Sequence, residues 1–346
     1  MSVIYLLDSY YSHRKTGLDN CRLLKKHVRL SYGSEPEPSP SLLNRSKILI
    51  YHRELSRQPN LAAWRAAGLK LIAYSVWECS YLPDAYIEAL RGFDEVWVPS
   101  PFCVDVYAQH GFKAQWVPHC VARPVSDPKP APSQAQIMLF LKMVDPRKNC
   151  NWLLTQLIEA QSQQPQLFSE FTFALVGRPE DFQHPLVQLF QKTCPASRSH
   201  VDPTETELDQ VYQQSDLLIS AHHGEGWGLT LSEAMAQGLL VLASGWSGNL
   251  AFMNAQNAVL LPGQLIPIGS DAAFYPTWEA DMLWFQPDAS AFQSALKQAM
   301  QGILNGDPHI AELRLKAREI VHPFGEVSLE HNLQGQVSRW QERGWL

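Results

Sequence analysis

The chain has 346 residues, 45% of them hydrophobic, which suffices for two domains with separate cores and excludes a largely disordered protein. Its formal net charge of -6 argues against nucleic acid as the main partner. The charge is uneven, because residues 1–125 carry 15 Lys and Arg against 11 Asp and Glu, and the acidic excess lies in the remainder.

Short apolar runs separated by segments of helix length recur along the chain, a pattern that predicts buried parallel strands. In the first part the runs are Val3–Leu7, Ile48–Tyr51, Leu69–Tyr74, Glu95–Val98 and Gln115–Val117. They resume with Ile137–Met143, Phe171–Val176, Asp216–Ser220, Leu239–Ala243 and Ala258–Leu261. Strand–helix alternation in both parts predicts an α/β protein with two Rossmann-like, doubly wound domains that face an interdomain cleft.

The stretch between the two sets of strands is rich in proline, which breaks both helix and strand, so an interdomain linker is expected there. Its prolines are Pro124, Pro128, Pro130 and Pro132. Further on, the aromatic-rich stretch 275–285 has no clear assignment, and two helical stretches follow at about 291–320 and 327–343. The expected divisions are a first Rossmann-like domain at 1–122, the linker at 123–135, a second Rossmann-like domain at 136–322 and a last helix at 323–346.

Neither the cysteines nor the first residues suggest export or a metal site. The six cysteines are scattered without a C-x-x-C pair, which favours free thiols in a reducing cytosol. Met1 to Asp8 is apolar but lacks a basic flank and a cleavage signature, so a buried first strand is expected rather than a signal peptide. We therefore expect a cytoplasmic protein.

The most informative segment runs from His223 to Gly238, directly after an apolar strand. It has the pattern of a glycine-rich turn followed by a short helix, and N–H groups at such a helix start can hold phosphate oxygens. Glu225 in the turn and Glu233 in the helix add two hydrogen-bond acceptors. Acceptors on both sides of an anion site would suit a nucleotide sugar, which carries hydroxyls at both ends of a diphosphate.

A second group of polar residues follows the first strand of the second domain. Lys142, Arg147 and Lys148 place three cations within seven residues, and a pyrophosphate needs such donors. The alternative is a solvated basic loop. Ser247, Gly248 and Asn249 follow a later strand and offer either N–H groups for the diphosphate or a helix cap.

These residues resemble the E-x7-E motif of retaining family-4 glycosyltransferases, whose fold is the two-domain GT-B architecture. The matching segments are Glu225-Gly226-Trp227-Gly228-Leu229, then Glu233-Ala234-Met235-Ala236, then Ser247-Gly248-Asn249. The resemblance implies that Glu225 bonds the hydroxyls of the donor sugar, that Glu233 bonds the ribose, and that Lys148 holds the diphosphate. Lys142 stands where the family has Arg. The donor-binding residues implied are thus Lys142, Arg147, Glu233, Gly226, Gly228, Leu229, Thr230, Ser247, Gly248 and Asn249, with Glu225 and Lys148 as the catalytic pair.

The first domain departs from the family pattern. The family's glycine-rich loop after strand one corresponds to Lys15–Asn20, where only Gly17 remains of the glycine pair. The family's histidine after a middle strand is missing, and Ser75 stands nearest to it. Glu78, His52 and His119 are the other candidates on the acceptor side. For these last three, a structural side chain with satisfied partners is an equal alternative.

The resemblance implies a retaining transferase that moves a hexose-type sugar from a nucleotide diphosphate sugar to an acceptor hydroxyl, in polysaccharide, glycan or glycolipid biosynthesis. The donor would lie mainly on the second domain, and the acceptor would be a glycan, a lipid-linked or a small molecule. No metal or other cofactor is expected. Two rivals stay open: a nucleotide-sugar epimerase on the same fold, and a catalytically dead sugar-nucleotide or glycan-binding module.

A basic segment at residues 14–29 bears on where the protein acts. Its cations are Arg14, Lys15, Arg22, Lys25, Lys26 and Arg29, with leucines between them. One interpretation is peripheral contact with the inner face of an anionic membrane or with a lipid-linked phosphate acceptor. The other is a solvated amphipathic helix whose leucines pack on the sheet.

Overall fold

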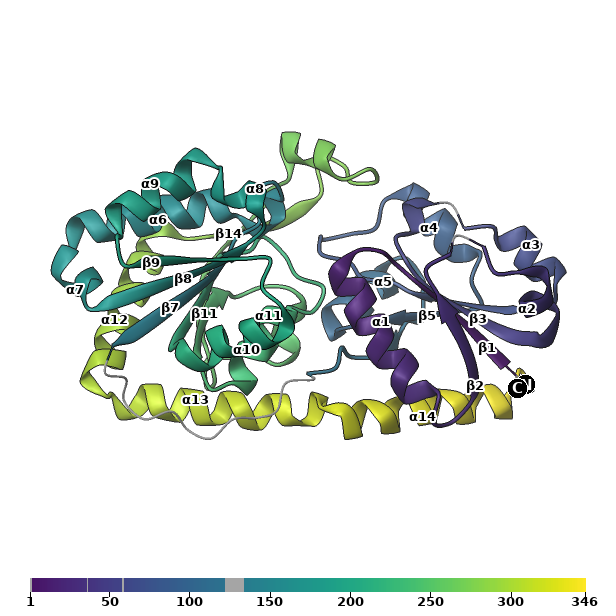
Figure 1. Cartoon of the computed structure of the whole chain (residues 1–346). Coiled ribbons are helices and arrows are strands. Elements are labelled where there is room, and N and C mark those ends of the chain that lie inside the picture. The colour runs from purple at the N-terminus through teal and green to yellow at the C-terminus, as the bar shows by residue number, and fades with distance from the viewer. Residues whose placement is uncertain (1, 36, 58, 122–133) are drawn as a thin grey trace.

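The computed structural model describes residues 2–35, 37–57, 59–121 and 134–346. Within them lie two six-stranded sheets with the strand orders β2-β1-β3-β4-β5-β6 and β12-β11-β10-β7-β8-β9. All strand pairs within these two sheets are parallel. Figure 1 shows the two domains side by side, with helices covering the sheets. The predicted α/β fold with two Rossmann-like domains is confirmed.

The first sheet is buried at its centre and half exposed at its β2 edge. Its strands are β1 Ser2–Leu7, β2 Arg29–Gly33, β3 Ser46–His52, β4 Lys70–Tyr74, β5 Glu95–Val98 and β6 Gln115–Trp116. The accompanying helices are α1 Tyr11–Leu24, α2 Pro40–Arg45, η1 Leu55–Arg57, α3 Leu61–Ala66, α4 Asp84–Arg91 and α5 Pro101–Gln109. The expectation that Arg29 belongs to the basic helical segment is wrong, since it begins β2 and pairs with Ser2. An edge strand needs no continuous apolar run, which is why the sequence pattern missed it.

The second sheet carries the same alternation of strand and helix. Its strands are β7 Ala135–Phe140, β8 Phe171–Gly177, β9 Ser197–Val201, β10 Leu217–Ser220, β11 Leu240–Ser244 and β12 Val259–Leu261. Its helices are η2 Pro146–Lys148, α6 Cys150–Gln163, α7 Pro165–Ser169, α8 Pro179–Phe182, α9 Pro185–Thr193, α10 Glu205–Gln214, α11 Leu229–Ala236, η3 Gly248–Ala251, α12 Ala289–Asn305 and α13 Pro308–Val321. Residues 123–133 of the predicted linker, which include its four prolines, lie outside the described residues. Ala135, the last residue of the predicted linker, is the first residue of β7.

An antiparallel hairpin that the sequence pattern missed joins the two domains. It consists of β13 Gly263–Pro267 and β14 Leu283–Pro287, with the 3-10 helix η4 Gly269–Phe274 between them. Ile268, Met282 and Trp284 are buried in the same apolar cluster as first-domain side chains such as Trp77. The hairpin also bonds the first domain through its backbone, since Ser80 N donates to Leu283 O at 3.1 Å. It occupies part of the aromatic-rich stretch that had no assignment.

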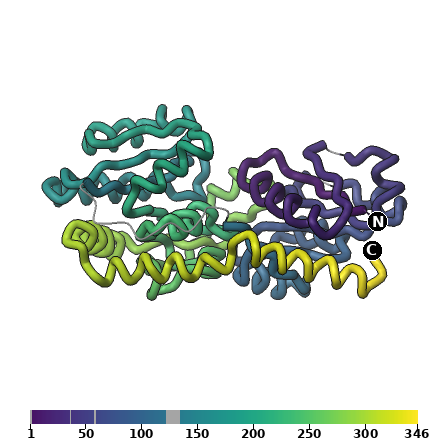
Figure 2. Tube along the Cα trace, turned by 60° about the horizontal axis from the view of Figure 1, so that its bottom comes forward, coloured from purple at the N-terminus to yellow at the C-terminus, as the bar shows by residue number. Residues whose placement is uncertain are grey.

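The chain returns to the first domain at its end. After the 3-10 helix η5 His322–Phe324, helix α14 Glu326–Glu342 runs along the first domain, as the yellow tube in Figure 2 shows. Its apolar side chains complete the cluster formed by β1, β3 and β4; they are Leu329, Leu333, Val337 and Trp340. Trp340 stacks on Trp97 with ring centroids 5.6 Å apart. None of the described helices has the length and apolar character that a membrane-spanning helix requires.

Candidate active site

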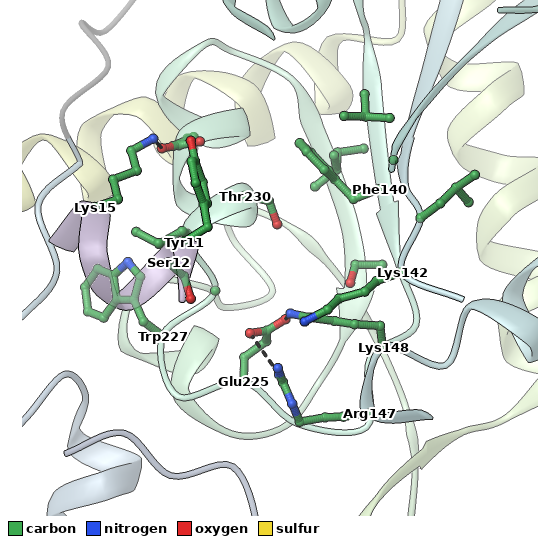
Figure 3. Close-up of a pocket in the computed structure, with 18 of the residues that line it drawn as sticks. Tyr11, Ser12, Lys15, Phe140, Lys142, Arg147, Lys148, Glu225, Trp227 and Thr230 are labelled. Atoms are coloured by element: carbon green, nitrogen blue, oxygen red, sulfur yellow. Dashed lines mark hydrogen bonds and ion pairs between the residues drawn. The ribbon is translucent and has the colours of Figure 1, made fainter. Parts of the chain in front are cut away.

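A cavity of about 400 Å³ lies between the two domains, at the carboxyl ends of β1, β4, β7, β8 and β10. Parallel sheets bind ligands at this edge because the strand ends and the following loops expose polar groups there. From the first domain, residues 10–13, Lys15, Val76, Glu78 and His119 line the cavity. Figure 3 shows the opposite wall, where Lys148 and Arg147 converge on Glu225.

Close backbone packing builds the turn that carries Glu225. A Cβ on Gly224 would lie 2.2 Å from the carbonyl oxygen of Glu78, so only glycine lets the turn approach the first domain. Gly228 has φ 95°, a left-handed conformation that favours glycine, and it directly precedes α11. Gly226, Gly228, Leu229 and Thr230 all line the cavity.

Ser247, Gly248 and Asn249 lie behind this turn and do not line the cavity. The Ser247 hydroxyl accepts a hydrogen bond from Glu225 N at 2.8 Å, and Gly248 N donates to Glu225 O at 2.7 Å. Asn249 is fully buried and donates to Ser244 O. These contacts hold the Glu225 turn in place, whereas the side-chain oxygen Oδ1 of Asn249 is buried and has no hydrogen-bond partner among the described residues.

Glu225 is a buried carboxylate held by two cations. Lys148 Nζ lies 2.5 Å from its Oε1, and Arg147 lies 3.4 Å from its Oε2. Burial by itself raises the pKa of Glu225, but the Lys148 ammonium and the Arg147 guanidinium outweigh this and lower the pKa to about 2. The carboxylate is therefore ionised at neutral pH and can accept hydrogen bonds from ligand hydroxyls.

Arg147 and Lys142 lie in the loop after β7, where Asp145 pairs with both side chains. Asp145 caps η2, and its carboxylate lies 3.0 Å from Lys142 and 3.6 Å from Arg147. Lys142 also bonds the Tyr10 hydroxyl, and Arg147 donates to Gly224 O at 2.8 Å. With Lys148, three cationic side chains thus line one wall of the cavity, where they can donate hydrogen bonds to an anionic ligand.

The far end of the cavity is formed by Glu233 on α11. This residue is 3% exposed, and its Oε1 accepts from Lys15 of the first domain at 2.7 Å. Its Oε2 accepts from the Tyr212 hydroxyl at 3.2 Å. Glu225 and Glu233 therefore line the same cavity, with Thr230 and the start of α11 between them in the chain.

Two of the acceptor-side candidates line the cavity. Glu78 is half-buried, and its carboxylate lies 3.8 Å from Arg147 across the domain boundary. His119 is 5% exposed, and neither ring nitrogen has a hydrogen-bond partner among the described residues. Burial lowers the pKa of His119 to about 3, so the ring is neutral and can exchange hydrogen bonds with a ligand.

His52 and Ser75 are buried behind the cavity wall and do not line it. His52 Nδ1 bonds the Tyr5 hydroxyl at 2.9 Å, and the Ser75 hydroxyl contacts the hydroxyls of Tyr86 and Tyr107. Their hydrogen bonds are thus made with core tyrosines.

The predicted glycine-rich loop at Lys15–Asn20 is wrong, because these residues lie inside α1. Gly17 serves helix packing: a Cβ there would lie 2.4 Å from Leu7 Cδ2 and 3.1 Å from His52 Nδ1. The loop after β1 is instead the short stretch from Asp8 to Tyr10, where Asp8 accepts a hydrogen bond from Tyr10 N at 3.0 Å.

Sequence reasoning missed the cavity residues that begin α1. Tyr10, Tyr11, Ser12 and His13 all line the cavity. Burial lowers the pKa of His13 to about 4, although Asp8, 3.9 Å away, opposes the shift. The position of these four residues directly after the first strand could have identified them, because loops at that point face the ligand in doubly wound sheets.

Two doubly wound domains that face each other across a cavity define the GT-B class of fold, and solved glycosyltransferases share it. The pneumococcal O-GlcNAc transferase GtfA has TM-score 0.63 and 19% identity over 86% of this chain and 58% of that one. Anabaena HepE has TM-score 0.67 and 14% identity over 98% and 100%. A glycosyltransferase of Rickettsia africae has TM-score 0.65 and 15% identity over 99% and 98%.

The second domain also matches in sequence. Residues 135–275 match the family model described as "Glycosyl transferases group 1". The GtfA subunit of the UDP-N-acetylglucosamine–peptide N-acetylglucosaminyltransferase of Streptococcus pneumoniae is 31% identical over 117 residues, or 33% of this chain. The match spans 22% of that relative, so the chain covers about a fifth of its length.

Proposed function

We propose that the chain is a retaining glycosyltransferase of group 1, which moves a hexose-type sugar from a nucleoside diphosphate sugar to an acceptor hydroxyl. The observation that carries the proposal is the Glu225 carboxylate, 2.5 Å from the Lys148 ammonium, in an interdomain cavity also lined by Arg147 and Lys142. The pneumococcal GtfA structure holds UDP with GlcNAc, and the HepE structure holds UDP with glucose. These neighbours support UDP as the nucleotide.

In the proposed reaction the cations act on the leaving group. A departing diphosphate gains negative charge, and Lys148, Arg147 and Lys142 supply fixed positive charge where that gain occurs. The proposal therefore needs no metal ion. The low pKa of Glu225 and its two cationic partners make the carboxylate a weak nucleophile, which favours a role in orienting sugar hydroxyls while the acceptor attacks from the side of the leaving phosphate.

The acceptor would enter from the first-domain wall. Glu78 and His119 lie there, and each presents a polar group to the cavity without occupying the cationic wall. Burial raises the pKa of Glu78 above its ordinary value, although Arg147 opposes this. A carboxylate shifted in this direction is a better hydrogen-bond partner and base for an acceptor hydroxyl. A glycan or glycolipid product, as in polysaccharide biosynthesis, is part of the proposal.

Two further observations support the proposed cytoplasmic location of the enzyme. All six cysteines are free and buried, which supports a reducing compartment such as the cytoplasm. In the basic segment, Arg22 pairs with Glu326 at 2.7 Å and Lys26 with Glu330 at 2.6 Å. Because α14 supplies these carboxylates, we favour a helix packed within the protein over a membrane-facing one. Sedimentation with anionic and neutral liposomes at low salt tests this, and selective binding to the anionic ones would reverse it.

The experiment that tests the function is a hydrolysis panel. Purified protein is incubated with UDP-glucose, UDP-GlcNAc, GDP-mannose and ADP-glucose, and release of free nucleoside diphosphate is measured. Slow release from one donor, lost in Glu225→Gln and kept in the exposed control Glu88→Gln, supports the transferase. An epimerised sugar among the products would favour the epimerase, and binding without any turnover would favour the binding module. In a reaction that includes an acceptor, the anomeric configuration of the product shows whether the configuration of the donor sugar is retained.

A further inference from the structure

Asp8 at the end of β1 and His13 in the first turn of α1 form a carboxylate–imidazole pair at the cavity wall. His13 lines the cavity, and its Nδ1 lies 3.9 Å from Asp8 Oδ2. This distance is long for a hydrogen bond, as catalytic contacts often are before a substrate binds. Nδ1 is buried and has no hydrogen-bond partner within the part of the chain that the structure describes. Because Nδ1 faces Asp8, Nε2 on the opposite side of the ring is the nitrogen left for a ligand.

The Asp8 carboxylate is fully buried and is held mainly by the backbone. It accepts hydrogen bonds from Tyr10 N at 3.0 Å and Glu54 N at 3.2 Å, and Arg57 lies 3.0 Å from Oδ1. Burial raises the pKa of Asp8, but these hydrogen bonds and the Arg57 guanidinium outweigh burial and lower the pKa. An ionised carboxylate beside Nδ1 of His13 favours the tautomer with the proton on Nδ1, which leaves the lone pair on Nε2.

Two neighbouring rings restrict the orientation of the His13 ring. The Tyr10 ring meets it edge-on with ring centroids 5.6 Å apart, and the His52 ring lies tilted against it at the same centroid distance, 5.6 Å. The His13 side chain is 12% exposed, so it is largely shielded from water. A side chain that is already held in one orientation loses little freedom when a substrate binds.

We propose that His13 is the catalytic residue that takes the proton of the attacking hydroxyl, with Asp8 as its positioning residue. The acceptor oxygen forms a bond to the anomeric carbon, the bond from that carbon to the diphosphate oxygen breaks, and the hydroxyl proton moves to Nε2. The Asp8 carboxylate compensates for the charge of the imidazolium, which later returns the proton to the released diphosphate or to water. The inference rests on the proposed function and adds the group that receives the proton.

The charges around His13 link its basicity to the donor. In the empty site burial lowers the pKa of His13 to about 4, with Arg147, Arg57 and Lys142 adding to this shift and Asp8 opposing it. The ring thus lies close enough to the cationic wall to feel its charge, on the side where the acceptor is proposed to attack. A diphosphate bound by Arg147 and Lys142 would compensate for their charge, so the pKa of His13 should rise when the donor binds.

The other titratable groups near this ring are less suited to take the proton. Burial lowers the pKa of both His52 and His119, and in the described ranges neither ring has a carboxylate within ion-pair distance. Glu78 lies 3.8 Å from Arg147, so its negative charge is shared with that guanidinium before any substrate binds. Glu78 can accept a hydrogen bond from the acceptor, whereas His13 combines access to the cavity with a counter-charge behind it.

The test measures hydrolysis of the donor identified by the hydrolysis panel, because water then replaces the unknown acceptor. His13→Gln can form hydrogen bonds but cannot take a proton, so kcat should fall by about 10²-fold or more. Affinity for the nucleoside diphosphate, measured by titration calorimetry, should stay within about twofold of wild type. His27→Gln is the matched control, since His27 Nε2 also lies beside a carboxylate, 3.4 Å from Glu330, but outside the cavity.

The pH dependence separates a base from a structural side chain. The kcat of the wild-type protein should fall as the pH drops through the pKa of His13 in the donor complex, and the residual activity of His13→Gln should lack this fall. Asp8→Asn should move the fall to lower pH, because the imidazolium loses its counter-charge. Imidazole added to His13→Ala should restore part of the rate.

Three results would overturn the inference. An unchanged kcat in His13→Gln would show that the leaving diphosphate takes the proton itself. A loss of nucleoside diphosphate affinity equal to the loss of kcat would make His13 a donor contact. A pH dependence that persists in His13→Gln and disappears in Glu78→Gln would assign the proton to Glu78.

Two further outcomes keep the inference distinct from the proposed function. If the wild-type protein releases diphosphate from no donor, the proposed function fails as well. If His13→Gln does not fold, nuclear magnetic resonance of the wild-type protein provides the test, since the pKa of the His13 ring should be higher with bound nucleoside diphosphate than without it. Equal pKa values in the two states would contradict the inference.

Discussion

Lys148 Nζ and Glu225 Oε1 lie 2.5 Å apart, although the two residues follow different strands of the second sheet. Lys148 comes from the loop after β7 and Glu225 from the turn after β10, and these strands are neighbours. Under the proposed function, a donor would have to separate this pair on entry. Sugar hydroxyls would replace the ammonium on Glu225, while the ammonium turns to the diphosphate. The site thereby keeps both charges compensated in the empty and the occupied state.

Glu225→Gln is expected to reduce transfer by about 10²–10³, since it removes a charge that orients hydroxyls in a shielded site. The measurement is kcat with the donor identified by the hydrolysis panel. Circular dichroism should show an unchanged fold, and Glu88→Gln, a change at an exposed glutamate, should leave kcat unaltered. Turnover of the Gln variant at the wild-type rate would remove Glu225 from the reaction.

Lys148→Ala should weaken nucleotide binding more than Lys142→Ala. Lys148 faces Glu225 in the cavity, whereas Lys142 is shared with Asp145 and the Tyr10 ring and hydroxyl. Titration with UDP should reveal the difference, and uridine, which lacks phosphates, should show almost none. Lys192→Ala, at an exposed position on α9, is the control. If uridine and UDP lose affinity equally, Lys148 does not contact the phosphates.

The free energy of unfolding should fall as the pH drops from about 6.5 towards 4. Burial lowers the pKa of His119 to about 3 and that of His13 to about 4, against about 6.5 in the unfolded chain. In this window the unfolded chain binds more protons than the native one, so acid favours unfolding, by about 1 kcal/mol or more per histidine at pH 5.

Denaturant titrations at pH 7 and pH 5 measure this effect. His119→Asn should flatten the dependence, while His331→Asn, at an exposed position on α14, should leave it unchanged. A slope of the opposite sign, or the same slope in both variants, would contradict a neutral buried His119.

Trp340→Ala should destabilise the protein by about 3–5 kcal/mol, the usual cost of a large cavity in a core. The Trp340 ring is fully buried and stacks on Trp97 at 5.6 Å. Val327→Ala on the same helix is the control, because Val327 is 71% exposed and should cost almost nothing. Equal melting temperatures for the two variants would show that α14 contributes little to the first domain.

Strands with continuous apolar runs could be predicted from the sequence, because a strand that is buried on both faces consists almost entirely of apolar residues. Ile48–Tyr51 lies within β3 Ser46–His52, and Phe171–Val176 differs from β8 by one residue at its end. The edge strands β2 and β9 were not predicted, because they are partly exposed and contain both polar and apolar residues. The hairpin β13–β14 escaped because its aromatic side chains pack on another domain.

The second-domain residues of the candidate site could be predicted because glycines and charged residues lie close together in the sequence. The first-domain residues could not be predicted, because they come from the start of a helix rather than from a glycine loop. Tyr10 and His13 become neighbours of Lys142 and Arg147 only when the domains meet, and no local pattern encodes that meeting.

Helix α14 has a consequence for how the protein folds as it leaves the ribosome. The apolar face of the first sheet is completed by side chains of α14, which are synthesised after the whole second domain; they are Leu329, Leu333, Val337 and Trp340. Until they emerge, the first domain exposes a face that includes Trp97, while the second domain can already close its own core. The first domain, although it precedes the second in the chain, should thus finish folding after it, and in the interval its exposed apolar face can bind a chaperone.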